Sequence, residues 1–221
     1  MLFLRKKFES SPELARIAPF AVYALFTFLQ GEGDFRYWSY IIKTAVAIWI
    51  LWEVRPFVPE MRWAVSWEAV AVGIAIFVIW VGMEGYYPPL SDVGPGASPF
   101  EHFGNRVGLA WCYVLIHLLG MTFVVPPAEE LFYRSFLYRY FVKIDFRAMP
   151  FNQFHALSFF VTSIIFGLMH PDSWLPGIIC GLAYQWLVIR KNRLGDAMTA
   201  HGITNLLLGL WILWKHQWSF W

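Results

Sequence analysis

Charged residues are scarce in this chain of 221 residues: Asp, Glu, Lys and Arg together make up 14%. Soluble globular domains carry roughly a quarter charged residues, whereas this chain is 58% hydrophobic and 20% aromatic. The composition therefore excludes an ordinary soluble domain and predicts a membrane protein. A formal net charge of only +2 gives no strongly basic surface, so no nucleic-acid partner is expected.

Cysteine is scarce as well. The two cysteines, Cys112 and Cys180, both lie in apolar runs, which excludes a disulfide framework and a cysteine-based metal knuckle. The N-terminal stretch MLFLRKKFESSPELAR places its hydrophobic residues before its charges and has no small-residue cleavage site. We therefore do not expect a cleaved signal peptide.

Long apolar runs, separated by charged or Pro/Gly-rich breaks, are abundant and predict helices. The expected helices cover residues 14–30, 38–54, 67–84, 107–141, 154–170, 174–189 and 196–214. A spanning helix takes about 20 residues, so the chain accommodates about seven to eight crossings and no additional soluble domain. The predicted fold class is all-α: a polytopic integral membrane bundle of about seven to eight transmembrane helices.

The fourth run, 107–141, is too long for one crossing, because at 1.5 Å per residue it would extend roughly 50 Å. Pro126 and Pro127 lie in its middle. Proline removes a backbone donor and disrupts the preceding helical turn, so this run is expected to kink or split there.

Basic residues are distributed unevenly over the expected loops, and cytoplasmic loops are enriched in Lys and Arg. With seven crossings and a cytoplasmic N-terminus, the outer side collects Arg36, Arg106 and Lys215, with Lys43 a short way into the second helix. The inner side collects Arg5, Lys6, Lys7, Arg16, Arg55, Arg62, Arg139, Lys143, Arg147, Arg190, Lys191 and Arg193. This bias predicts that the N-terminus lies in the cytoplasm, and we expect an integral protein of the bacterial inner membrane.

Ionisable groups inside apolar runs are costly, so their default interpretation is functional. Glu130 and Arg134 are spaced i to i+4 with the acid first, the favourable order for a helical ion pair. Glu129 is turned about 100° around the helix and lacks that partner. A desolvated carboxylate is a candidate general base, although a pair of acids at a helix end in the headgroup region is the alternative.

Two further motifs carry polar groups. His170 ends an apolar run, and His201 and Asn205 share a helical face at i and i+4, where they could hold a water or a developing oxyanion. His117 and Glu84 are interpreted as structural, the latter as an outer helix end. Together, Glu129, His170, His201 and Asn205 favour a hydrolytic or metal-type site.

Simple hairpins put the two histidines of this set at opposite ends of their helices. His170 would lie at the outer end of the fifth helix and His201 near the inner end of the seventh. A common site therefore requires the break at Pro171 and Pro176 to fall inside the bilayer, or a tilted or re-entrant sixth helix around a water-filled cavity.

These motifs, Glu-Glu-x-x-x-Arg, Phe-x-x-x-His and His-x-x-x-Asn, resemble those of the CAAX-processing and bacteriocin-processing (Abi) family of intramembrane endopeptidases. The resemblance covers residues 107–214. It implies that Glu129 with His170 activates a water that attacks a peptide carbonyl. It also implies that His201 and Asn205 stabilise the oxyanion, while Glu130 and Arg134 brace the site.

The resemblance leaves the cofactor open. A mechanism without metal is preferred, and the sequence lacks a His-Glu-x-x-His zinc helix. Zinc is the alternative, with Glu129, His170 and His201 as its ligands. The partners implied are the lipid bilayer and a membrane-associated peptide or protein substrate, which could be lipidated or a C-terminal sorting segment.

The chain also departs from the family pattern. The family usually continues its first motif as Phe-Arg-Gly, where this chain has Tyr133-Arg134-Ser135. Residues 1–106, expected to form N-terminal transmembrane helices, match no named family and could select the substrate; residues 215–221 form a tail. A non-catalytic scaffold or immunity-type protein of the same family is the alternative function, and a proton-coupled transporter is a weaker one.

Overall fold

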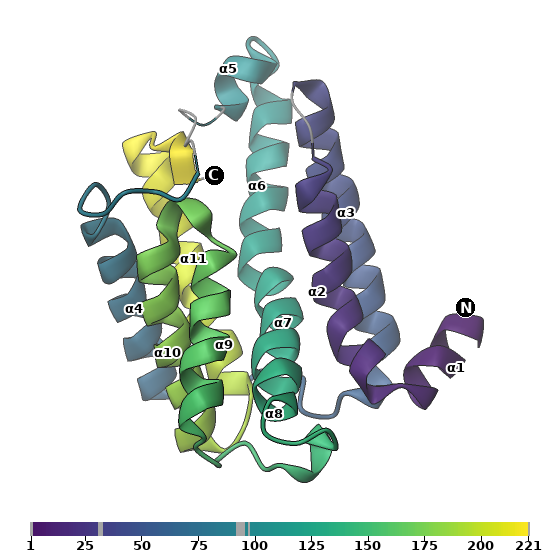
Figure 1. Ribbon diagram of the computed structural model, residues 1–221. Coiled ribbons are helices and arrows are strands. Elements are labelled where there is room, and N and C mark those ends of the chain that lie inside the picture. Colours follow the sequence, from purple (N-terminus) through teal and green to yellow (C-terminus); the bar gives the residue numbers. More distant parts are fainter. Residues whose placement is uncertain (1, 31–32, 92–95, 97, 221) are drawn as a thin grey trace.

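The protein is described by a computed structural model that covers residues 2–30, 33–91, 96 and 98–220 (Figure 1). These residues form helices joined by loops and turns, with no strand among them. The all-α prediction is therefore confirmed. Trp221, the last residue of the predicted tail, lies outside the described residues.

Each predicted helix is present, with ends within a few residues of those expected. The main helices are α2 (Pro12–Phe28), α3 (Asp34–Val54), α4 (Trp67–Gly82), α6 (Val107–Phe123), α9 (Ala156–Leu168), α10 (Trp174–Lys191) and α11 (Gly195–Lys215). Shorter pieces are α1 (Leu2–Ser10), α5 (Pro99–Phe103), α7 (Val125–Glu130), the π-helical segment η2 (Leu131–Leu137) and α8 (Tyr138–Tyr140). Single 3₁₀ turns occur at η1 (Arg55–Phe57), η3 (Phe146–Ala148), η4 (Pro171–Ser173) and η5 (Trp218–Phe220).

The long run after residue 107 is broken where the prolines predict. Helix α6 ends at Phe123 and α7 begins at Val125. Pro126 has no backbone N–H, and its ring would clash with the carbonyl of Thr122 in a continuous helix. The chain then continues as the π-helical η2, a geometry that is rare and frequently marks functional sites. The two glutamates lie between these two irregularities.

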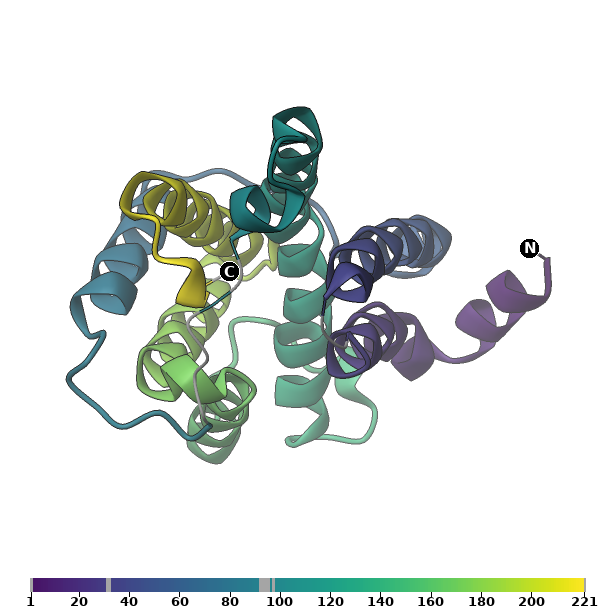
Figure 2. The ribbon, with the colours of Figure 1, turned by 90° about the horizontal axis from the view of Figure 1, so that it is seen from above.

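The helices pack on both sides of the column formed by α6, α7 and α8 (Figures 1 and 2). Helices α2 and α3 pair with each other on one side, where α2 contacts α7 and η2. On the other side α4, α9, α10 and α11 pack together, and α11 contacts α6 and α7. The column that carries the glutamates is thus enclosed by both halves of the chain.

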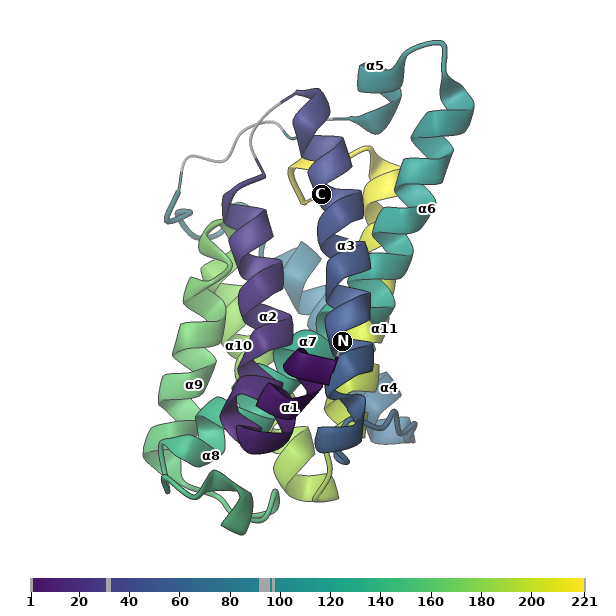
Figure 3. The same ribbon diagram turned by 90° about the vertical axis from the view of Figure 1, so that its right-hand side faces the viewer.

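Loops gather at the two ends of the bundle (Figure 3). The connections from α3 to α4, from α8 to α9 and from α10 to α11 lie at the lower end in Figure 1, which we call the basic end because most Lys and Arg lie there. The opposite end, which we call the upper end, carries α5, the connection from α9 to α10 and the chain's C-terminus.

By length and composition, two helical stretches qualify as candidate membrane spans: Val107–Tyr140 and Gly195–Lys215. Two shorter helices, Trp67–Gly82 and Ala156–Leu168, are also apolar. The apolar helices are consistent with the predicted membrane protein.

Small residues let α9 and α10 approach closely. The Cα of Gly167 lies 2.9 Å from the position that a Cβ on Gly177 would take. The Cα of Ser163 likewise lies 2.8 Å from the position that a Cβ on Gly181 would take. Such contacts allow helix backbones to pack directly on each other, as is common in membrane bundles. This packing fixes the end of α9, and with it His170.

Replacing Gly167 by Ala is expected to lower the free energy of unfolding by about 1–3 kcal/mol, the usual cost of overpacking. The new Cβ would lie 2.6 Å from the Trp174 carbonyl oxygen and 2.7 Å from the Ile178 nitrogen, both backbone atoms. Denaturation in mixed micelles measures the effect. The matched control is Gly108→Ala in α6, where nothing lies within 4 Å and the change should be neutral or stabilising. Equal stability of the two variants would contradict the close packing.

Candidate active site

The two glutamates at the end of α7 are both buried, with 8% of Glu129 and 0% of Glu130 exposed. Oε1 of Glu130 lies 3.2 Å from Nη1 of Arg134, so the predicted ion pair is present. The guanidinium carbon of Arg134 also lies 4.4 Å from the centre of the Phe166 ring. Glu130 and Arg134 therefore form a buried pair that aromatic rings shield from water.

His201 contacts both glutamates. Its Nδ1 lies 3.0 Å from Oε1 of Glu130, and its Nε2 lies 3.9 Å from Oε2 of Glu129. The ring packs on Tyr184, with ring centres 5.2 Å apart. Since a carboxylate can only accept, Nδ1 donates to Glu130, which fixes the orientation of the imidazole and aims Nε2 at Glu129.

The sequence motifs instead predict that Glu129 acts together with His170. Among the described residues no ion-pair contact joins these two, and the histidine against Glu129 is His201. His170 follows α9 in a non-helical conformation (φ −117°, ψ 67°), as expected for a residue before proline. Its Nδ1 donates to the carbonyl oxygen of Phe166 at 2.9 Å, which leaves Nε2 for other partners.

Asn205 lies one turn after His201 on α11 and bonds to the end of α6. Its Nδ2 donates to the carbonyl oxygen of Met121 at 2.7 Å. The last carbonyls of a helix have no partners within the helix, so this bond caps the break before α7. The amide carries a second N–H, which remains able to bind another acceptor.

His170, His201 and Asn205 line one cavity of about 670 Å³. Glu129 is not among the described lining residues, and it reaches the cavity through its contact with His201. Helix α9 has 13 residues and so extends about 20 Å, less than the roughly 30 Å hydrocarbon core of a bilayer. The 3₁₀ turn η4 begins directly after His170, and His170 and His201 line one cavity although simple hairpins would separate them.

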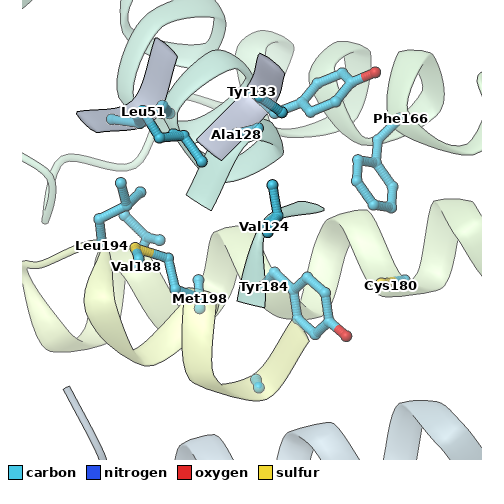
Figure 4. Close-up of a cluster of buried hydrophobic side chains, with 14 of the residues drawn as sticks. Leu51, Val124, Ala128, Tyr133, Phe166, Cys180, Tyr184, Val188, Leu194 and Met198 are labelled. Atoms are coloured by element: carbon cyan, nitrogen blue, oxygen red, sulfur yellow. The ribbon is translucent and has the colours of Figure 1, made fainter. Parts of the chain in front are cut away.

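The cavity is backed by the main hydrophobic cluster of the bundle (Figure 4). Tyr133, Phe166 and Tyr184 come from η2, α9 and α10 and are all almost fully buried. The ring of Phe166 lies between Tyr133, at 5.0 Å, and His170, at 4.9 Å. Phe166 and Tyr184 also line the cavity, so part of its wall is formed by buried aromatic rings.

A second buried polar group, centred on Ser135, was not predicted from the sequence. Its hydroxyl donates to Oε1 of Glu60 and accepts from Nε of Arg16 at 3.1 Å and Nη2 of Arg139 at 2.8 Å. Burial raises the pKa of Glu60, but the Arg16 charge and the hydrogen bonds from Arg16 and Ser135 outweigh burial and hold it below its ordinary value. The only signal in the sequence was Ser135 itself, which stands where the family pattern has glycine.

If zinc binds, the ligands predicted from the sequence are Glu129, His170 and His201. In the described part of the chain, no three His, Cys, Asp or Glu side chains come together in a way that could hold a metal ion. No such group contains Glu129, His170 and His201, and the zinc alternative stays a prediction.

Comparison with known proteins finds a family whose model is similar to the part of the chain that carries the site. Residues 110–207 match the family model described as type II CAAX prenyl endopeptidase Rce1-like. No curated protein and no solved structure matches. The matched stretch contains all six predicted site residues, from Glu129 to Asn205, and the family is a protease family. Residues 110–207 are thus similar to the Rce1-like family of type II CAAX prenyl endopeptidases, in agreement with the resemblance that the motifs predicted.

Proposed function

We propose that the protein is an intramembrane endopeptidase that hydrolyses a peptide bond near or within the bilayer, with Glu129 as general base. One observation supports this most strongly. A buried carboxylate without a helical ion-pair partner faces the free nitrogen of His201, which lines a cavity large enough for a peptide segment. A desolvated carboxylate next to a cavity is suited to take a proton from water.

In the proposed reaction, a water held by Glu129 and Nε2 of His170 loses a proton to Glu129. The hydroxide forms a bond to the carbonyl carbon of the substrate. The oxyanion accepts hydrogen bonds from the second N–H of Asn205 and from Nε2–H of His201, whose imidazole in this proposal carries a second proton there while Nδ1–H stays bonded to Glu130. Glu129 then returns the proton to the leaving nitrogen as the C–N bond breaks, giving a new carboxylate and a new amine.

Glu130 and Arg134 act in this proposal as positioning residues. Glu130 accepts from Nδ1 of His201, so it orients the imidazole, while Arg134 balances the charge of Glu130. Rigid support of this kind matters because small displacements of catalytic groups cost large factors in rate.

The membrane arrangement that we propose has about seven to eight crossings, with the N-terminus cytoplasmic in a bacterial inner membrane. The uneven distribution of Lys and Arg over the two ends supports the orientation. The N-terminal part, 1–106, also contributes to the site, because Trp80 of α4 and Glu84 beyond it line the cavity. We propose that this part selects a membrane-associated peptide, lipidated or belonging to a C-terminal sorting segment.

We expect cleavage to need no metal. Purified protein in proteoliposomes, treated with EDTA or 1,10-phenanthroline, should cleave a membrane peptide at an unchanged rate. Mass spectrometry of the products measures the rate and locates the cut. Loss of cleavage that added Zn²⁺ restores would overturn the metal-free mechanism and return Glu129, His170 and His201 to the role of ligands.

The protease proposal is tested by the same assay with Glu129 altered. Loss of cleavage in a folded Glu129→Gln variant supports the general base. A chain that functions in its host unchanged by this substitution would instead be the non-catalytic scaffold. Glu129-dependent proton flux without cleavage would indicate the transporter.

A further inference from the structure

The cavity opens at the upper end of the bundle. Its buried lining residues, such as Phe166, Tyr184 and His201, lie deep between the helices. All of its exposed lining residues in the described part of the chain lie at or near the helix ends and loops of the upper end: Thr27, Glu84, Gly85, Pro89, Pro171 and Asp172. A path from solvent to His201 therefore begins at the upper end.

The rim of this opening is fixed by contacts between the segment after α4 and η4. The backbone N–H of Leu90 donates to the carbonyl oxygen of Pro171 at 2.9 Å. Nε1 of Trp174 donates to the carbonyl oxygen of Pro88, also at 2.9 Å. These hydrogen bonds join two segments that are far apart in the sequence, so tertiary contacts hold the rim of the opening in place.

The basic end is closed below the glutamates. The group formed by Arg16, Glu60, Ser135 and Arg139 fills the space one to two turns below Glu130. The loop before α4 covers the start of α11: Oγ1 of Thr199 donates to the carbonyl oxygen of Ala64 at 2.9 Å. A Cβ on Gly195 would lie 2.1 Å from the carbonyl oxygen of Arg62, so backbone packs directly on backbone there.

Charge distinguishes these two ends. The closed end carries the Lys and Arg residues assigned above to the inner side, whereas the described mouth is lined by the acids Glu84 and Asp172 and by no Lys or Arg. Basic loops remain in the cytoplasm. The closed end is thus the cytoplasmic one, and the open end faces the other side.

We infer that the catalytic cavity takes its substrate from the non-cytoplasmic side of the membrane. The substrate class is a polypeptide segment already translocated across the membrane, or the non-cytoplasmic flank of a spanning segment. A chain whose scissile bond stays in the cytoplasm cannot reach Glu129 by this route. The inference rests on the proposed function for the chemistry, but the side of access depends only on the fold and its orientation.

Cysteine accessibility in intact bacterial cells tests the inference. In a Cys112→Ser, Cys180→Ala background, single cysteines are placed by Tyr86→Cys at the rim, Leu208→Cys in the cavity wall and Ile144→Cys at the closed end. Tyr86 and Ile144 form a matched pair, because both are loop residues, 86% and 80% exposed. The probe is a membrane-impermeant, negatively charged methanethiosulfonate.

We expect the probe to react at Tyr86→Cys and at Leu208→Cys in intact cells, and at Ile144→Cys only after permeabilisation. Reaction at Ile144→Cys in intact cells, or at Leu208→Cys only after permeabilisation, would overturn the inference. Membrane-fraction immunoblots confirm that each variant is inserted. If this pattern holds while no cleavage is found, the proposed protease function fails and the side of access stands.

Discussion

Glu129→Gln should lower kcat/KM for peptide cleavage by about 10²–10⁴-fold, the usual contribution of a general base, and leave the fold intact. Glutamine has the same shape as glutamate and can still accept a hydrogen bond, but it cannot take a proton from water. The contact with Nε2 of His201, 3.9 Å long, is too long to be a hydrogen bond that the fold depends on. Cleavage in proteoliposomes, followed by mass spectrometry, measures the loss.

The matched control is Glu9→Gln at the end of α1, where the side chain is exposed. It removes the same charge from the surface and should leave both cleavage and thermal unfolding unchanged. Glu130→Gln separates the roles of the neighbouring acids, because it should lower stability as well as rate. A Glu129→Gln protein that cleaves at the wild-type rate would eliminate Glu129 as the base.

Local features of this fold were predictable from the sequence. Apolar runs located the main helices, and the missing N–H of Pro126 located the break before α7. The Glu130–Arg134 pair was predictable because both residues lie on one helix, one turn apart. Helix α5 was missed because its five residues lie within a Pro- and Gly-rich stretch that is typical of a loop.

Contacts between distant segments were not predictable in the same way. His201 and Glu130 are 71 residues apart, and spacing within one helix cannot say which histidine a carboxylate on another helix will meet. The side chains of Arg16 and Ser135, 119 residues apart, likewise meet only because α2 packs on η2. Spacing also could not predict that His170 and His201 line one cavity, because this depends on where the end of α9, at Leu168, packs in the bundle.

The departure from the family pattern at Ser135 has a physical explanation. A glycine there could not donate to Glu60 or accept from Arg16 and Arg139. Two guanidinium groups buried beside one carboxylate need these additional partners, because a buried charge without partners is costly. The serine thus joins the N-terminal helices to the segment that carries Glu130 and Arg134.

Arg134→Met should have the largest effect on stability, lowering the free energy of unfolding by about 3–5 kcal/mol. Only 1% of Arg134 and 0% of Glu130 are exposed, so removing the cation leaves a buried carboxylate uncompensated. The loss of the guanidinium from the face of Phe166, 4.4 Å away, adds to the cost. Denaturation in mixed micelles measures it, and Arg147→Met, at an exposed position, is the control.

The double variant Glu130→Gln/Arg134→Met distinguishes a broken ion pair from lost packing. Removing both charges leaves no unpaired ion, so the double variant should be more stable than Arg134→Met alone, although it carries one substitution more. Its activity should stay low. The neutral amide introduced by Glu130→Gln could still accept from Nδ1 of His201, but it would lack the negative charge that the proposed mechanism places beside the imidazole. Equal stability of the single and double variants would show that Arg134 contributes through packing on Phe166 and Tyr184 and not through Glu130.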